Sequence, residues 1–204
     1  MDKFIGEPNL MPLQTEPFNG DKFICNELIK LRDKFNIRYA IELGSCVGGS
    51  AKWFGENFKD VWTVEINPVF RDICLKRIEE NKNVCSLLGS TVELLEGLLD
   101  ICIENGETPL IFIDSHWESY FPLFDELKII GNSSLKPIIL IHDCKVPNEP
   151  NLGFDKWNGI EISYETIKPY LDEIYGEKGY THYYNSDKES TEIKRGVIYI
   201  LPNE

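Results

Sequence analysis

Acidic, histidine and hydroxyl side chains follow five apolar runs of this sequence, and they are its main candidates for chemistry. Each run is short and ends where small or polar residues begin. In an open parallel sheet, ligands bind beyond the carboxyl ends of the strands, so side chains at these positions would meet at one edge. The sequence therefore predicts a ligand site built from five segments: 42–44, 65–67, 89–91, 114–116 and 142–143.

The first segment opens the glycine-rich turn "IELGSCVGGS" at 41–50, for which three kinds of ligand are considered. A dinucleotide turn needs glycine two positions after Gly44, and Cys46 stands there instead. Gly44 and Gly49 have the spacing of a P-loop, but Ser-Ala follows in place of Lys and Ser/Thr. Both phosphate-binding patterns therefore fail, and the turn favours a ligand without phosphate.

A cationic ligand with a ribose suits the same turn. Glu42 would repel a polyphosphate but would contribute negative charge towards the sulfonium and ammonium of S-adenosylmethionine. Glycines at 44, 48 and 49 let the chain turn sharply against such a ligand. Glu65 ends the next apolar run, where an acid can accept hydrogen bonds from ribose hydroxyls. The simpler alternative is a tight helix-opening turn and a surface glutamate.

The histidines divide by position. His116 and His142 end neighbouring apolar runs, so each is a candidate general base, metal ligand or hydrogen-bonded histidine. His142 adjoins Asp143, which favours a functional role. His182 lies in the C-terminal region and is expected to be structural, and Cys144 is expected to be an inert thiol.

The elements that would position these residues alternate along the chain. Apolar runs without polar alternation are typical of parallel strands covered on both faces, and strands alternating with helices indicate a doubly wound α/β sheet. We expect a single domain over 1–204, with 1–19 as an N-terminal arm and a closing C-terminal hairpin. The expected strands are 39–43, 61–66, 84–89, 110–114, 137–143, 181–185 and 196–201. The expected helices are 21–35, 49–58, 69–81, 91–104 and about 118–130.

Composition excludes several classes of protein. The net charge of −13 disfavours nucleic-acid binding, which depends on cationic neutralisation of phosphate. No apolar run approaches the ~18–20 residues of a membrane span, and the first residues lack the apolar core of a signal peptide. The six cysteines form no C-x-x-C pair, which predicts reduced thiols in a cytoplasmic protein.

The segments "IELGSCVGGSAKWF", "VWTVEINP", "LLGSTVELL", "FIDSHWESYFPLFDEL" and "IILIHD" together resemble a class I S-adenosylmethionine-dependent methyltransferase. Within that class the chain is similar to the metal-dependent small-molecule O-methyltransferases, of the catechol type and of the antibiotic sugar and cephalosporin type. The resemblance covers roughly residues 38–145. It implies a Rossmann-like, mostly parallel seven-stranded sheet with an antiparallel C-terminal hairpin.

The resemblance also implies a donor site. The residues that would line the methionine end of S-adenosylmethionine are Glu42, Gly44, Ser45, Gly48 and Ser50. The residues that would hold its ribose and adenine are Glu65, Ile66, Ser90 and Trp117. Asp114 would lie near the methyl group.

For the metal, the resemblance implies Asp114, His142 and Asp143 as ligands of a divalent ion, Mg²⁺ or Mn²⁺. The catechol type has Asp-Asn where this chain has Asp143-Cys144, and a thiol is a poor Mg²⁺ ligand. A histidine in the set weakens the case for Mg²⁺ and admits Mn²⁺, Fe²⁺ or Zn²⁺. The catalytic lysine of the catechol type is Glu118 here, so the catalytic candidates are Asp114, His142 and His116.

The function so predicted is O-methylation of a hydroxyl on a small molecule or sugar, with no nucleic-acid or membrane partner. The loop at 145–161, with Trp157, and the N-terminal arm are expected to contact the acceptor. Two alternatives stay open: a catalytically silent S-adenosylmethionine-binding or scaffold protein, and a nicotinamide-dependent oxidoreductase. The sequence also leaves the oligomeric state open, a homodimer included.

Overall fold

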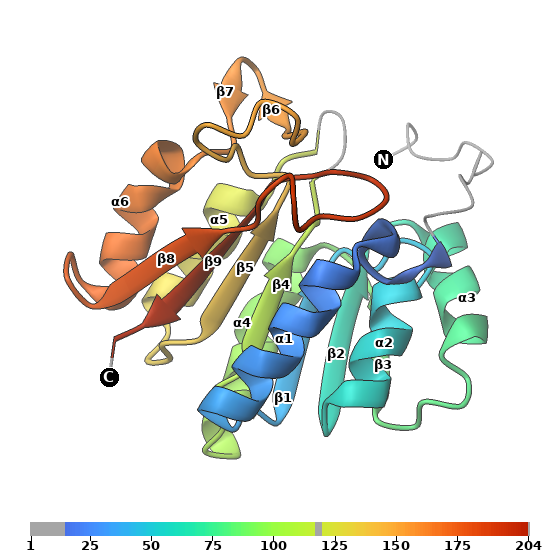
Figure 1. The fold of residues 1–204 in the computed structure, drawn as a ribbon. Coiled ribbons are helices and arrows are strands. Elements are labelled where there is room, and N and C mark those ends of the chain that lie inside the picture. The colour runs from blue at the N-terminus through green and yellow to red at the C-terminus, as the bar shows by residue number, and fades with distance from the viewer. Residues whose placement is uncertain (1–14, 117–119, 204) are drawn as a thin grey trace.

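The structure is a computed structural model that describes residues 15–116 and 120–203. Its centre is one mixed sheet with strand order β3-β2-β1-β4-β5-β9-β8 (Figure 1). The strands from β3 to β5 run parallel, and β9 is antiparallel to both β5 and β8. This confirms the predicted sheet and its closing hairpin. The strands are β1 (Tyr39–Leu43), β2 (Asp60–Glu65), β3 (Val84–Leu88), β4 (Leu110–Ile113), β5 (Ile138–His142), β8 (Tyr180–Tyr184) and β9 (Val197–Pro202).

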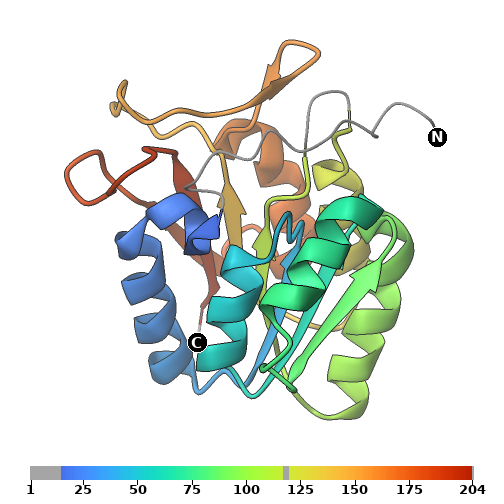
Figure 2. The ribbon, with the colours of Figure 1, turned by 90° about the vertical axis from the view of Figure 1, so that its right-hand side faces the viewer.

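Helices cover the sheet in two layers, and each strand sends alternate side chains to opposite faces. Ala40 and Phe112 join one core with α1 and α2, which lie side by side in Figure 2. Ile41 and Ile111 join the other core, with α4, α5 and α6. The helices are α1 (Lys22–Phe35), α2 (Gly49–Asn57), α3 (Pro68–Arg77), α4 (Thr91–Glu104), α5 (Leu123–Asn132) and α6 (Tyr164–Tyr175). Burial on both faces explains why the central strands are mostly apolar.

Several details differ from the expected elements: α3 ends at Arg77 and not at 81, and α6 is not among the expected helices. β3 is an edge strand with Leu88 50% exposed, so the expectation of cover on both faces is wrong there. The helix expected from about 118 begins at Leu123, after Pro122. The loop after β5 contains a small hairpin, β6 (Lys156–Trp157) and β7 (Ile160–Glu161), which the sequence did not indicate. No helix in the described part of the chain is long and apolar enough to cross a membrane.

Residues 15–20 are packed against the domain. The first fourteen residues of the expected arm lie outside the described residues, but Pro17–Gly20 forms a tight turn in which Phe18 and Asn19 have positive φ values of 51° and 55°. Phe18 belongs to the arm that was expected to contact the acceptor, and for this residue the expectation is wrong, because Phe18 is only 3% exposed. Its ring packs edge-on against three core rings, at centroid distances of 5.3 Å from Trp53, 5.5 Å from Phe54 and 5.1 Å from Phe112.

Truncating Phe18 should therefore destabilise the whole domain. We expect Phe18→Ala to lower the free energy of unfolding by about 3–5 kcal/mol, because it removes a buried ring and leaves a cavity. Chemical denaturation measures this, with Phe35→Ala as the matched control, since Phe35 is only partly buried at the end of α1. Equal losses in the two variants would contradict a core role for Phe18.

Candidate functional site

The glycine-rich turn between β1 and α2 lies in close contact with the end of β4. Gly44 has φ +97°, and a Cβ atom there would lie 2.3 Å from the carbonyl oxygen of Asp114. Gly48 has φ +83°, and a Cβ atom there would lie 2.7 Å from Sγ of Cys74. Only glycine fits this conformation and this spacing. The turn therefore lies directly beside Asp114. This is the arrangement expected if the glycine-rich turn and the end of β4 belong to one ligand site.

Glu65 holds the same turn from the other side. Its carboxylate accepts a 2.8 Å hydrogen bond from the backbone N–H of Cys46 and another of 2.8 Å from that of Asn67. The side chain thus links the turn to the start of α3, and the residue is only 7% exposed. Its predicted role at a ribose stays a prediction, but the structure brings it against the glycine-rich turn.

Glu42 is fully buried beneath the turn. Its Oε2 accepts a 2.5 Å hydrogen bond from Oγ1 of Thr63, and its Oε1 has no hydrogen-bond partner among the described residues. Burial, together with the negative charges of Asp114 and Glu65, raises the pKa of Glu42 to about 8. The carboxyl is therefore protonated at neutral pH, so it lacks the constant negative charge that the sequence suggested.

Two serines of the predicted methionine end differ in their contacts. Ser45 is buried, and its Oγ has no partner among the described residues. Ser50 Oγ accepts a 3.1 Å hydrogen bond from the backbone N–H of Phe18. Ser50 therefore already anchors the N-terminal segment, whereas Ser45 retains an unused hydroxyl next to the turn.

The predicted adenine side lies at the ends of β2 and β3. Ile66, which follows Glu65, is 39% exposed, so its apolar side chain is accessible to a ligand such as the predicted adenine. Ser90 is the N-cap residue of α4, and its Oγ lies 2.9 Å from the hydroxyl of Tyr120. Trp117 and Glu118 lie outside the described residues, so the predicted packing of Trp117 on adenine is untested.

Glu126 is a buried acid that the sequence reading missed. Its Oε1 accepts hydrogen bonds from Oγ1 of Thr91 and from Oγ of Ser115, the latter at 2.6 Å. It therefore joins the start of α4 to the segment after β4. Burial raises the pKa of Glu126 to about 7, although both hydroxyls oppose the shift. Glu126 lies at helical spacing from Leu123, Leu127 and Ile130, which form the buried face of α5. This spacing could have indicated from the sequence that Glu126 is buried.

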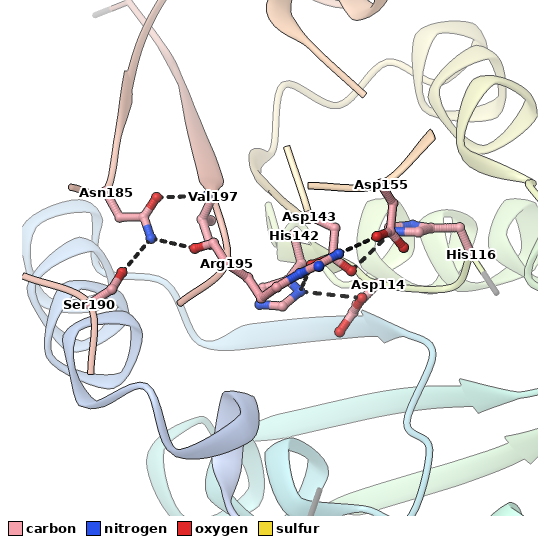
Figure 3. A network of polar contacts seen from close by, with 9 residues as sticks. All are labelled: Asp114, His116, His142, Asp143, Asp155, Asn185, Ser190, Arg195 and Val197. Carbon is pink, nitrogen blue, oxygen red and sulfur yellow. Dashed lines mark hydrogen bonds and ion pairs between the residues drawn. The ribbon is translucent and has the colours of Figure 1, made fainter. Parts of the chain in front are cut away.

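Asp114, His142 and Asp143 converge at the ends of β4 and β5 (Figure 3). His142 Nδ1 lies 3.5 Å from Oδ1 of Asp114 and 3.1 Å from Oδ1 of Asp143. Burial lowers the pKa of His142, but the two carboxylates outweigh it and hold the pKa well above its usual value. His142 is therefore protonated at neutral pH while no other cation is present. The three predicted metal ligands do lie together.

A second group of charged side chains adjoins the first. His116 Nε2 lies 3.4 Å from Oδ2 of Asp143 and 3.7 Å from Oδ2 of Asp155. Arg195 pairs with both acids, through Nε to Asp143 and through Nη2 to Asp155 (Figure 3). The sequence placed His116 in the site but missed Asp155 and Arg195, which follow no strand of the parallel sheet.

The loop after β5 runs beyond the carboxyl end of that strand (Figure 2). Gly153 forms an isolated bridge with Arg195, and the backbone N–H of Asp155 donates to the carbonyl of Asp143 at 3.0 Å. Trp157 stacks on Phe121 at a centroid distance of 5.5 Å, and Phe121 lies 5.9 Å from His116. The loop thus brings an aromatic surface beside the charged groups.

The donor set fits a divalent ion. Asp114, His142 and Asp143 each offer one ligand atom, and these atoms lie within 4.8 Å of one another. Two carboxylates and one imidazole are ligands that Mn²⁺, Fe²⁺ and Zn²⁺ accept. Asp114 and Asp143 face His142, and Asp143 and Asp155 face the guanidinium of Arg195, so each acid of the two groups already has a basic partner.

His182 and Cys144 behave as the sequence predicted. His182 stacks on Tyr164 at 3.9 Å in β8, and burial lowers its pKa. Cys144 is fully buried, and burial raises the pKa of its thiol. All six cysteines lie within the described residues and are free, though Cys85 is exposed. Neither His182 nor Cys144 belongs to either charged group.

No protein-family profile matches the chain, and no curated protein sequence matches it. Solved structures do. The O-methyltransferase TomG from Streptomyces achromogenes, involved in tomaymycin synthesis and in complex with SAM, has a TM-score of 0.58 at 14% identity, over 89% of this chain and 80% of that one. A putative caffeoyl-CoA O-methyltransferase from Staphylococcus aureus has a TM-score of 0.56 at 17% identity, over 88% and 83%.

An O-methyltransferase from Bacillus cereus in complex with SAH has a TM-score of 0.57 at 18% identity, over 96% of this chain and 83% of that one. At such identities the likeness concerns the fold. It confirms the predicted fold class, the Rossmann-like sheet that these methyltransferases share.

The buried carboxyl of Glu126 should give stability a defined pH dependence. Its folded pKa of about 7 exceeds the ordinary value of 4.5, so the folded state binds a proton that the unfolded state releases between these values. The free energy of unfolding should therefore fall as pH rises from about 4.5 to about 7. We expect Glu126→Gln to lose the share of this decrease that Glu126 causes. The free energy of unfolding of the variant, relative to that of the native chain, should therefore increase with pH.

Denaturation with urea at pH 5 and at pH 7.5 measures the effect. Glu96→Gln, an exposed acid on α4, serves as the control and should follow the native pH dependence. If Glu126→Gln showed the same pH dependence of stability as the native chain, Glu126 would be ionised in the folded protein.

Proposed function

We propose that this chain is an S-adenosylmethionine-dependent methyltransferase that methylates a hydroxyl of a small molecule or sugar, assisted by a divalent ion. The observation that carries the proposal is the contact between the turn at Gly44 and the end of β4 at Asp114. It puts the predicted donor turn, closed by Glu65, beside the acid and histidine groups. TomG and the Bacillus cereus protein, which have the same fold, are described as O-methyltransferases in complex with SAM and SAH.

The reaction is an in-line displacement, so the protein mainly holds the partners in position. The bond from the methyl carbon to sulfur breaks as the bond to the acceptor oxygen forms. The electron pair of the broken bond stays on sulfur, which becomes a neutral thioether. The hydroxyl proton passes to Asp114, which is the more exposed of the two aspartates around His142.

The metal part of the proposal rests on Asp114, His142 and Asp143. A divalent ion bound there would orient the acceptor oxygen and lower the pKa of its hydroxyl. His142 is a poor general base in the ion-free protein, because the two aspartates hold its pKa well above the usual value. The proposed proton acceptor is Asp114, because its carboxylate is the more exposed, and His142 serves as a ligand.

The acceptor that fits best is neutral or cationic. The chain carries a net charge of −13, and Asp114 is 29% exposed at the site. Both features repel phosphorylated compounds. The stacked rings of Trp157 and Phe121 provide a flat apolar wall, which suits a sugar ring or a phenol.

Two other functions remain candidates, and simple titrations separate them. A nicotinamide-dependent oxidoreductase would need a dinucleotide at the turn, where Cys46 replaces the expected glycine. Fluorescence titration with NADH and with S-adenosylmethionine compares those two ligands directly. A catalytically silent binding protein would bind the donor but transfer no labelled methyl group to any hydroxylated acceptor in a screen.

Donor binding should depend on Glu65. S-adenosylmethionine should stabilise the fold by mass action, and Glu65→Ala should weaken its binding by about 1.5–3 kcal/mol, the scale of hydrogen bonds to a charged group. Isothermal titration calorimetry measures the affinity, with Glu93→Ala, an exposed acid on α4, as the control. An unchanged affinity in Glu65→Ala would remove this residue from the ribose site.

Donor affinity should also rise with pH. The donor is a cation and binds better beside ionised Glu42, whose pKa is about 8 in the free protein. Below that pH a proton must leave on binding, so affinity should fall by up to about tenfold for each pH unit. Calorimetry between pH 6.5 and 9 should show this slope in the native protein and a flatter profile in Glu42→Gln. If the affinity of both proteins changed equally with pH, the ionisation of Glu42 would not be coupled to donor binding.

A further inference from the structure

The carboxylate of Asp143 serves two histidines with its two oxygens. Oδ1 lies 3.1 Å from Nδ1 of His142, and Oδ2 lies 3.4 Å from Nε2 of His116. Each histidine has a second aspartate of its own, Asp114 on one side and Asp155 on the other. The site is therefore two similar groups of ligand atoms that share one carboxylate (Figure 3).

His116 is the residue least explained by the single metal site. The side chain is buried, at 2% exposure, yet neither ring nitrogen has a hydrogen-bond partner among the described residues. The distance of 3.4 Å from Nε2 to Oδ2 of Asp143 exceeds the 2.7–3.2 Å of an ordinary hydrogen bond. Nε2 thus faces two carboxylate oxygens, both beyond ordinary hydrogen-bond distance, and a cation between the three atoms would give each of them a close partner.

Arg195 orients the two carboxylates around that point. Its guanidinium bonds Oδ1 of Asp143 and Oδ1 of Asp155, which leaves Oδ2 of each acid turned towards His116. Charged partners that fix ligating carboxylates in this way are typical of the surroundings of metal sites. Arg195 thus contacts the Oδ1 atom of each acid, which in Asp143 also faces His142, and leaves both Oδ2 atoms available on the side of His116.

We propose a second divalent-cation site formed by Nε2 of His116, Oδ2 of Asp143 and Oδ2 of Asp155. One ligand atom from each of these residues lies within 4.8 Å of the other two, and the nitrogen and oxygen donors suit Mn²⁺ or Zn²⁺ better than Mg²⁺. The site adjoins the predicted one at Asp114, His142 and Asp143, with Asp143 as the shared ligand. The second site depends on the proposed function only in that Asp143 would also be a ligand of the first ion.

Counting bound ions tests this without any methyl acceptor. Equilibrium dialysis with Mn²⁺ should give two ions bound to each native chain. Asp155→Asn and Asp114→Asn should each retain one ion, and Asp143→Asn should weaken both. Electron paramagnetic resonance adds an independent readout: two neighbouring ions in the native protein should couple and broaden the signal, whereas a single ion in Asp155→Asn should show the resolved lines of isolated Mn²⁺.

The matched control is Asp187→Asn, which removes a carboxylate that contacts Lys194, the neighbour of Arg195, and lies in neither group. It should bind two ions. His116→Gln provides a second variant on the proposed site and should bind one, with thermal melts checking that each variant is folded. One ion in the native chain, or two in folded Asp155→Asn, would overturn the second site. Calorimetry with S-adenosylmethionine then reports separately whether the donor site of the proposed function fails.

Discussion

The absence of a side chain at Gly44 is the constraint on which the site depends. A single Cβ atom there would overlap the carbonyl of Asp114, and the φ of +97° is one that other residues rarely adopt. Because the two backbones touch, the glycine-rich turn and the end of β4 form one surface. Glu65 fixes the turn from the opposite side through Cys46. The donor half and the charged half of the site are thus joined through the main chain.

Burial decides the charge state of the acids around this surface. Glu42 and Glu126 are both fully buried, and their pKa values rise to about 8 and about 7, so Glu42 keeps its proton near neutrality and Glu126 keeps it in part. Asp143 is also buried, but His142, His116 and Arg195 hold its pKa well below the usual value. An acidic chain can therefore keep several carboxyl groups together, because some are neutral and the others are paired with cations.

The sequence predicted the parallel sheet because its signals are local: an apolar run, a polar end and a helical period. It also brought Asp114, His142 and Asp143 together, since the strand ends of a parallel sheet share one edge. It could not find Arg195, which reaches Asp143 only because β9 pairs with β5. Nor could it distinguish Phe18 from the rest of an arm, since the ring is buried only by contacts with distant residues.

The place of β9 has a consequence for synthesis of the chain. β9 follows β8 in the sequence but lies between β5 and β8 in the sheet. Until β9 emerges from the ribosome, β5 has an unpaired edge, which is a surface prone to aggregation. Arg195, just before β9, also arrives late, so Asp143 and Asp155 lack their guanidinium partner until then. A nascent chain can therefore form the turn at Gly44 well before the charged cluster is complete.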